Sequence, residues 1–148
     1  MPRRKGISPV IATVIIVAVT IAVAIAVAFW MTGIVGLFTS AEKLEIVSLY
    51  AQTQAGGGWQ IQITVRNTGT TTTSIDEIFI NGVPHTQCNN VVFPNLPIPL
   101  NPGGQQNFQI TINQGATCGT TTFAAGGSVE VKLHTSSGKE YPKLTVLP

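Results

Sequence analysis

The sequence predicts an α+β fold in which a long N-terminal hydrophobic α-helix precedes an antiparallel, Ig-like β-sandwich. Two observations carry this prediction. Residues 7–38 contain no charged side chain, and a run of that length is typical of a membrane-spanning helix. Beyond Glu42, short segments of alternating apolar and polar residues are separated by turn signals, which is the pattern of an antiparallel sandwich.

The apolar segment is expected to form a helix over residues 7–41, although its alternation of large and small side chains resembles a strand. Strands run about 4–8 residues, which is far shorter than this segment. On a helix the same alternation places apolar side chains on every side, and all of them must be covered by lipid or protein. Ser8 is a good N-cap residue and Pro9 suits the first helical position, so the helix should start there.

The charge of the chain is unevenly distributed. Of the net +2, the leader residues Arg3, Arg4 and Lys5 supply +3, which leaves five Lys or Arg and six Asp or Glu for the rest. A nucleic-acid-binding face needs clustered cations on the folded part of the chain, so nucleic acid is not an expected partner. Because cations stay on the cytoplasmic side of a membrane, residues 42–148 are expected to form a globular domain outside the cell.

The globular part is expected to contain about seven or eight short strands. Asn81-Gly82 is the strongest two-residue hairpin signal and predicts a return strand after it. The proline-rich residues 95–104 cannot lie in a central strand and are expected to be an exposed connection. The other predicted strands are 44–52, 59–67, 74–80, 91–93, 107–113, 128–135 and 140–147.

The two cysteines, Cys88 and Cys118, both lie in the outward part of the chain. An oxidising exterior would let them form a disulfide, and two free buried thiols are the alternative. Their spacing from the histidines does not match the Cys, His and Met pattern of a copper site, so no metal is expected.

No catalytic set is apparent, and the chain is not expected to be an enzyme or to need a cofactor. His85 and His134 are the two histidines, and both are expected to be structural. Asp76 and Glu77 are adjacent, so on a regular strand they would point to opposite faces and could not act as a close carboxylate pair.

Two threonine runs are candidate acceptors for O-linked sugars. The alternative interpretation is polar, β-branched filling of exposed strand ends. The chain contains no Asn-x-Ser/Thr acceptor, so N-linked sugars are not expected. The candidate positions are Thr70, Thr71, Thr72, Thr73, Thr120, Thr121 and Thr122.

Three interpretations of the N-terminal segment compete. A secretory signal has an apolar core of about 7–15 residues, which is about half of what is found here. A plain membrane anchor fits the hydropathy, but 32 residues would span about 48 Å as a helix, against a hydrocarbon core of about 30 Å. The third interpretation is a helix that rests in the membrane and later packs against copies of itself. Its many alanines and two glycines would allow close helix approach and favour this interpretation.

The sequence RRKGISPVIATV at residues 3–14, followed by a long Ala/Val/Ile helix, resembles the class III signal and N-terminal helix of archaeal type IV pilins and archaellins. The sequence VRNTGTTTTSIDEIFING at residues 65–82 resembles their β-domain as well. This resemblance implies a lollipop-shaped subunit whose helix forms the filament core and whose β-domain forms the outer wall. Bacterial type IV pilins carry a glutamate near the helix start, and this helix does not.

The resemblance also implies a processing site. A prepilin peptidase would cut between Gly6 and Ile7 and remove residues 1–6 as a class III signal peptide. If the leader were retained, its three cations would enter the assembly, where their desolvation would be costly unless they stayed exposed. An assembly ATPase and a membrane platform protein are the other partners that the family implies.

The expected function is that of a structural subunit of an extracellular type IV pilus, used for surface adhesion and stored in the cell membrane as a precursor. Two alternatives are an archaellum subunit and a monomeric, membrane-anchored extracellular binding module. Assembly would proceed through helix packing between copies. The residues expected in the polymerisation core are Ile11, Val14, Ile15, Ala18, Ile21, Ala22, Ile25 and Phe29.

Overall fold

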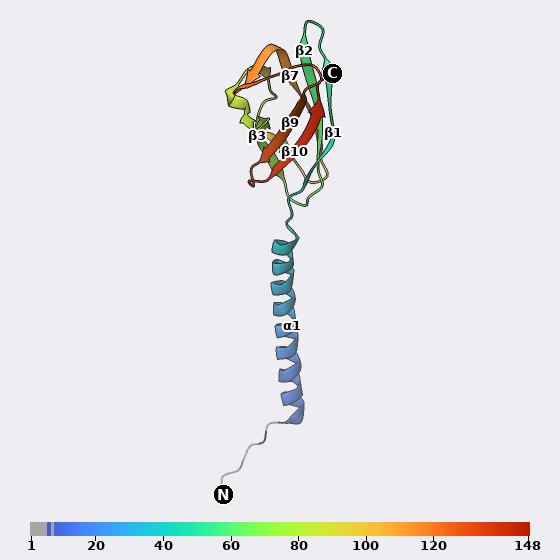
Figure 1. Cartoon of the computed structure of the whole chain (residues 1–148). Coiled ribbons are helices and arrows are strands. Elements are labelled where there is room, and N and C mark those ends of the chain that lie inside the picture. The colour runs from blue at the N-terminus through green and yellow to red at the C-terminus, as the bar shows by residue number, and fades with distance from the viewer. Residues whose placement is uncertain (1–5, 7) are drawn as a thin grey trace. The chain divides into compact units, whose positions relative to one another are not determined.

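The protein consists of two compact units, Met1–Ser40 and Ala41–Pro148, in a computed structural model that describes residue 6 and residues 8–148. The first unit contains helix α1 (Pro9–Thr39; Figure 1), and the second contains strands β1 to β10. The predicted fold class, one long apolar helix followed by antiparallel sheets in a sandwich, is confirmed.

Helix α1 begins and ends at residues that suit these positions. Pro9 occupies the first turn, and the carbonyl of Ser8 accepts hydrogen bonds from the amides of Ile11 and Ala12. The Ser8 side chain makes no capping hydrogen bond within the described part of the chain, so its contribution is that of the backbone alone. At the other end, the backbone becomes extended at Ser40, whose hydroxyl donates to the Gly36 carbonyl.

Two antiparallel sheets of five strands each make up the second unit. The first, sheet A, has the order β1-β2-β7-β5, with β8 paired to β7; its strands are Leu44–Thr53, Gly58–Asn67, Gln105–Cys118, Cys88–Val92 and Thr121–Thr122. The second, sheet B, has the order β10-β9-β3-β4, with β6 paired to β3; its strands are Glu140–Val146, Ser128–Thr135, Thr73–Ile80, Val83–Pro84 and Ile98–Leu100. A short 3-10 helix, His85–Gln87, connects β4 to β5.

The core lies between the two sheets and is built from alternate residues of their strands. In β2, Ile61, Ile63 and Val65 are at most 1% exposed, and the residues between them face outward. Strands β7 and β9 follow the same alternation, β3 follows it on either side of an irregularity, and burial of each such side chain contributes about 1.5–3 kcal/mol. Their innermost residues are Ile75, Ile78, Ile80, Ile110, Ile112, Val129, Val131 and Leu133.

The proline-rich connection differs in part from its prediction. Residues Ile98–Leu100 form strand β6, which pairs with β3 and buries Leu100 to 1% exposure. The expectation of an exposed connection over 95–104 is therefore wrong for these three residues. The physical reason is that proline is excluded from central strands but tolerated in an edge strand such as β6, where one side needs no amide donor.

Strand β3 also departs from regular alternation. A bulge between Ile75 and Glu77 adds a residue, so that Ile75 and Ile78 are both buried while Asp76 and Glu77 between them are not. The expectation that these two carboxylates point to opposite faces is therefore wrong, because a bulge resets the two-residue period. Asp76 accepts a hydrogen bond of 2.8 Å from the Ser74 hydroxyl.

Candidate functional site

Helix α1 presents apolar side chains to its surroundings along its described length. Ile15 is 55% exposed, Phe29 is 75% exposed and Phe38 is 86% exposed. None of the helix's residues is charged, and no part of its most apolar window is buried within the chain. Such a surface is unfavourable in water at every turn, so it requires lipid or protein around it.

The hydroxyl groups of α1 do not interrupt this surface. Thr13 donates to the Val10 carbonyl at 2.8 Å, Thr20 to Ile16 at 2.6 Å, and Thr32 to Ala28 at 2.9 Å. Each hydroxyl proton is therefore satisfied by the preceding turn of its own helix, as is common for Ser and Thr in apolar surroundings. These three hydroxyl groups therefore need no polar partner from outside the helix.

The residues expected in the polymerisation core share one side of α1. Their spacings of three, four and seven residues bring them into one stripe along the helix. All eight are exposed in the part of the chain that the structure describes: Ile11, Val14, Ile15, Ala18, Ile21, Ala22, Ile25 and Phe29. Their role in assembly stays a prediction.

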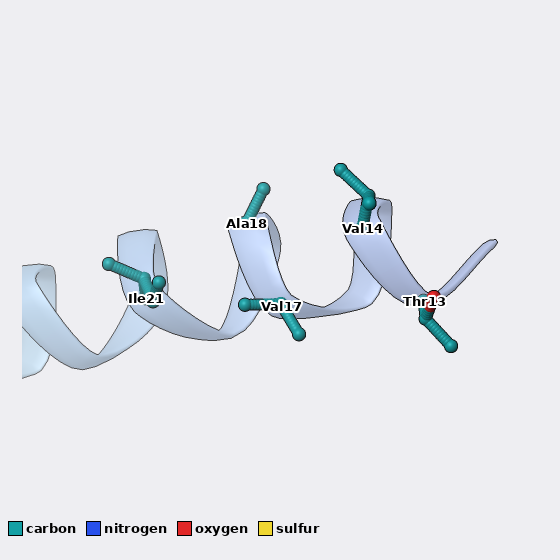
Figure 2. A pocket seen from close by; sticks show the side chains of 5 residues that line it. All are labelled: Thr13, Val14, Val17, Ala18 and Ile21. Carbon is teal, nitrogen blue, oxygen red and sulfur yellow. The ribbon is translucent and has the colours of Figure 1, made fainter. Parts of the chain in front are cut away.

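A shallow apolar hollow lies on the first half of α1. It is lined by Thr13, Val14, Val17, Ala18 and Ile21, and Figure 2 shows Val14 and Ala18 projecting from the same side of the helix. The hollow exists because the Ala18 methyl is much shorter than the branched side chains around it. A larger apolar side chain from outside could fill this position, in the manner of small-residue contacts between helices.

The length of α1 exceeds what a bilayer crossing requires. The 31 residues from Pro9 to Thr39 extend about 46 Å at about 1.5 Å per residue, and about 20 residues suffice to cross the hydrocarbon core. By length and composition, Pro9–Phe38 is a candidate membrane span. About one third of the helix therefore remains to be covered in some other way.

The predicted processing site lies only partly within the described chain. Gly6 is exposed, and a Cβ atom added to it would meet nothing within 4 Å. Ile7 and the leader cations Arg3, Arg4 and Lys5 lie outside the described residues. Cleavage between Gly6 and Ile7 therefore stays a prediction.

The chain enters the β-domain through a set of hydrogen bonds that we call the clasp, between residues 41–43 and the turn 68–70. Thr70 donates its amide to the Ala41 carbonyl at 2.8 Å, and the Thr70 hydroxyl accepts from the Ala41 amide at 3.0 Å. The Lys43 carbonyl accepts from the amides of Thr68 and Gly69. A side chain at Gly69 would collide with the Ala41 carbonyl, so the clasp requires glycine there. Nothing local in the sequence predicts the clasp, because it is a long-range backbone contact.

Cys88 and Cys118 form a disulfide in the structure. They face each other directly on β5 and β7, with their Cα atoms 4.0 Å apart. The Cys88 sulfur is therefore engaged and is not a thiolate metal ligand in this state. His85 Nδ1 lies 3.9 Å from Glu77 Oε1, and its ring contacts Phe93 edge-on at 5.6 Å. Over residues 6 and 8–148, no three His, Cys, Asp or Glu side chains gather as a metal site.

The threonine runs do not present all of their hydroxyls equally. Thr73 is 4% exposed, so a sugar could not be attached to it in the folded domain, and it leaves the set of candidate acceptors. The Thr70 hydroxyl takes part in the clasp. Thr70, Thr72, Thr120 and Thr122 are exposed, and Thr71 and Thr121 are half-buried.

Fold and surface together define a class: a β-sandwich protein joined to one long, uncovered apolar helix. No protein-family model and no curated protein matches the chain. Among solved structures, the apo PCuAC domain from PmoF1 is 12% identical with a TM-score of 0.50, over 73% of this chain and 98% of that one. At this identity the likeness concerns the fold alone.

Two archaeal proteins are also among the structural neighbours. The archaeal flagellum of Methanospirillum hungatei strain JF1 is 19% identical with a TM-score of 0.44, over 93% of this chain and 88% of that one. The archaellum periplasmic stator protein FlaG from Sulfolobus acidocaldarius is 14% identical with a TM-score of 0.42, over 70% of this chain and 99% of that one.

Proposed function

We propose that this chain is a structural, non-catalytic subunit of an extracellular filament, assembled by packing of α1 between copies. The observation that carries the proposal is the uncovered apolar surface of α1, which runs around the helix and extends beyond the thickness of a bilayer. Copies related by a repeating, non-closing rotation would cover this surface and generate a filament.

Packing between helices explains the small residues of α1, which a simple membrane anchor would not need. A single anchor surrounded by lipid needs neither small residues nor close approach, whereas association of helices without a hydrophobic driving force depends on both. Ala18, set in a hollow between larger side chains, offers one such approach site. We therefore favour a polymer over the alternative of a monomeric, membrane-anchored binding module.

The proposal includes the steps that lead from the precursor to the assembled subunit. The precursor would reside in the cell membrane with its leader on the cytoplasmic side. Cleavage by a prepilin peptidase between Gly6 and Ile7 would release the helix start at Ser8 and Pro9. An assembly ATPase and a membrane platform protein would then move the subunit into the filament outside the cell.

The decisive experiment identifies the first residue of the protein in material sheared from cells. We expect Ile7 as the N-terminal residue in a fraction that sediments at high speed and shows filaments by electron microscopy. Recovery of only a detergent-soluble monomer with residues 1–6 intact would contradict the proposal and favour the anchored module.

The effect of deleting the protein on attachment and on swimming distinguishes the two kinds of filament. Our first choice is a type IV pilus used for surface adhesion, for which deletion should reduce attachment and leave swimming unchanged. The resemblance of residues 3–14 extends equally to archaellins, so an archaellum subunit is the second candidate. Loss of swimming after deletion would select it.

A further inference from the structure

The outer face of sheet A carries a compact array of uncharged polar side chains, which we call the amide face. Strand register aligns them in two rows across β1, β2 and β7. One row is formed by Tyr50, Gln62 and Gln109, and the neighbouring row by Gln52, Gln60 and Thr111. Directly opposed residues of paired strands point to the same side, so all six share one surface. The residues between them along each strand pack into the core.

Charge is absent from this array and gathered elsewhere. The nearest charged pair on the same face, Glu45 opposite Arg66, lies four residues further along β2 from Gln62. The outer face of sheet B, by contrast, carries Lys132 and Glu140, which form an ion pair at 3.0 Å. An ion or a charged polymer would therefore find electrostatic partners on sheet B or at the Glu45 and Arg66 end of sheet A, and none within the amide face.

The amides of this face hold one another in position. The Gln62 Nε2 group donates to Gln60 Oε1 at 3.1 Å and to Gln109 Oε1 at 3.2 Å. A primary amide offers two donors and an acceptor with two lone pairs, so these bonds use only part of the available capacity. Over the described residues, the Nε2 groups of Gln60 and Gln109 have no protein partner and remain available to a ligand. Because the side chains are already oriented, binding would lose little conformational entropy.

Tyr50 adds an aromatic surface beside the amides. It is 47% exposed and stands directly opposite Gln62, at the edge strand of the sheet. The six residues include no other large apolar side chain, whereas protein–protein interfaces usually centre on a cluster of buried apolar anchors. An aromatic ring flanked by neutral donors and acceptors instead matches a ligand with apolar C–H groups and many hydroxyls.

We propose that the amide face binds a neutral oligosaccharide, with Gln60, Gln62 and Gln109 hydrogen-bonding its hydroxyls and Tyr50 contacting a ring face. The site is uncharged, its amides can both donate and accept hydrogen bonds, and it has one exposed aromatic ring. These three properties favour a neutral oligosaccharide over an anionic polymer. The inference goes beyond filament assembly and does not depend on it, since every residue involved lies in the β-domain.

The test is binding of the full-length chain to an immobilised panel of neutral and acidic oligosaccharides. The protein is kept in a polyoxyethylene detergent, because a sugar-based detergent would compete for the site. We expect retention on at least one neutral glycan, no preference for acidic ones, and about tenfold weaker retention for Gln62→Ala and for Tyr50→Ala. Gln87→Ala, an exposed glutamine outside the face, is the matched control and should bind like the parent.

The outcomes distinguish a binding site from other roles of the face. Unchanged circular dichroism spectra of the variants would show that loss of binding is not loss of fold, and Gln109→Ala provides a second variant at the same site. Absence of retention on all neutral glycans, or equal retention of parent and variants, would overturn the proposal. A loss of self-association in Gln62→Ala without any glycan binding would also overturn it and assign the face to contacts between copies.

Discussion

At the scale of single residues, Asn67 is a fully buried polar side chain that connects several parts of the β-domain. It is 0% exposed, and its Nδ2 group donates to the carbonyls of Thr71 and Leu100 at 2.8 and 3.1 Å. Its Oδ1 accepts from the Gly69 amide at 2.9 Å. One side chain therefore joins the turn after β2, the clasp and the end of β6, and it leaves none of its polar atoms without a partner.

Replacing Asn67 by alanine should lower the free energy of unfolding by about 2–3 kcal/mol, because buried backbone groups would lose their partner. Urea unfolding of the full-length chain in detergent measures this change. Asn107→Ala, at an exposed position of β7, is the control and should shift stability by less than about 0.5 kcal/mol. Equal effects of the two substitutions would show that Asn67 has no special role.

The sequence does not distinguish Asn67 from asparagines in ordinary turns. Its neighbours Thr68 and Gly69 predict a turn, but the partner Leu100, 33 residues away, becomes visible only when β6 pairs with β3. By contrast, Ile61, Ile63 and Val65 could be assigned to the core directly, because their alternation is a local property.

At the scale of elements, strand β1 is an edge strand, and lysines of β10 and of the turn before β10 bond one carbonyl within β1 and one just before it. Lys143 Nζ donates to the Ile46 carbonyl at 2.8 Å, and Lys139 Nζ donates to the Glu42 carbonyl at 2.7 Å. Unpaired carbonyls on an edge strand would otherwise invite pairing with another chain, and lysine is a common means of preventing it.

The double substitution Lys139→Met and Lys143→Met should therefore increase association of the protein through β1. Size-exclusion chromatography of the detergent-solubilised chain should show larger species than the parent. Lys132→Met removes one positive charge from the outer face of sheet B, away from the edge of β1, and serves as the control. If that control associates to the same degree, the loss of charge and not the exposed edge is responsible.

The disulfide between β5 and β7 should be a major source of stability for sheet A. A bridge with a sequence separation of 30 residues contributes about 3–4 kcal/mol in the chain-entropy model. Reduction of the parent should lower the urea midpoint accordingly. The reducing agent should leave the double variant Cys88→Ala, Cys118→Ala unaffected, and an unchanged midpoint of the reduced parent would contradict the expectation.

A strand could be predicted where a local pattern of residues determines it, and could not be predicted where its pairing with a distant strand determines it. The strands around 59–67 and 128–135 appear within about one residue of their expected bounds, since each alternates and ends at a turn. Strand β6 was missed because its prolines dominate the local signal, and its pairing with β3 is non-local. The bulge in β3 was missed for the same reason, as nothing in Ile75 to Ile78 announces an extra residue.

At the scale of the whole molecule, the proposed assembly depends on small residues in α1 that allow copies to approach. Ala22→Leu keeps the helix apolar, so membrane insertion should be unaffected, but it fills the space that a neighbouring helix would occupy. With overpacking costs of about 1–3 kcal/mol per contact, we expect sheared filaments to fall by about tenfold or more. Electron microscopy and the protein content of the sheared fraction measure the effect.

Val23→Leu is the matched control for this substitution. Val23 neighbours Ala22 in the sequence but points to another side of the helix, and it is not among the residues expected in the polymerisation core. Parent-like filament yield from Ala22→Leu, or an equal loss from Val23→Leu, would exclude the predicted stripe as the contact surface.

Much of the candidate assembly surface could be predicted, because apolar length and small residues are properties of the sequence itself. The hollow at Ala18 and the exposure of the stripe follow directly from the helical period. The amide face could not be predicted in this way. Gln60, Gln62 and Gln109 alternate visibly along their strands, but only the register of β1, β2 and β7 brings them together with Tyr50.

The clasp has a mechanical consequence for a subunit that is pulled through its helix. Tension on α1 would enter the β-domain first at Ala41, which is bonded to Thr70, and then at Lys43, whose carbonyl is bonded to Thr68 and Gly69, ahead of β1 along the chain. The disulfide joins β5 to β7, on the side of sheet A away from β1, and so lies off this route. Under such tension the hydrogen bonds of the clasp would be loaded before the strands, and they could re-form after release, while the covalent bridge would hold β5 and β7 together.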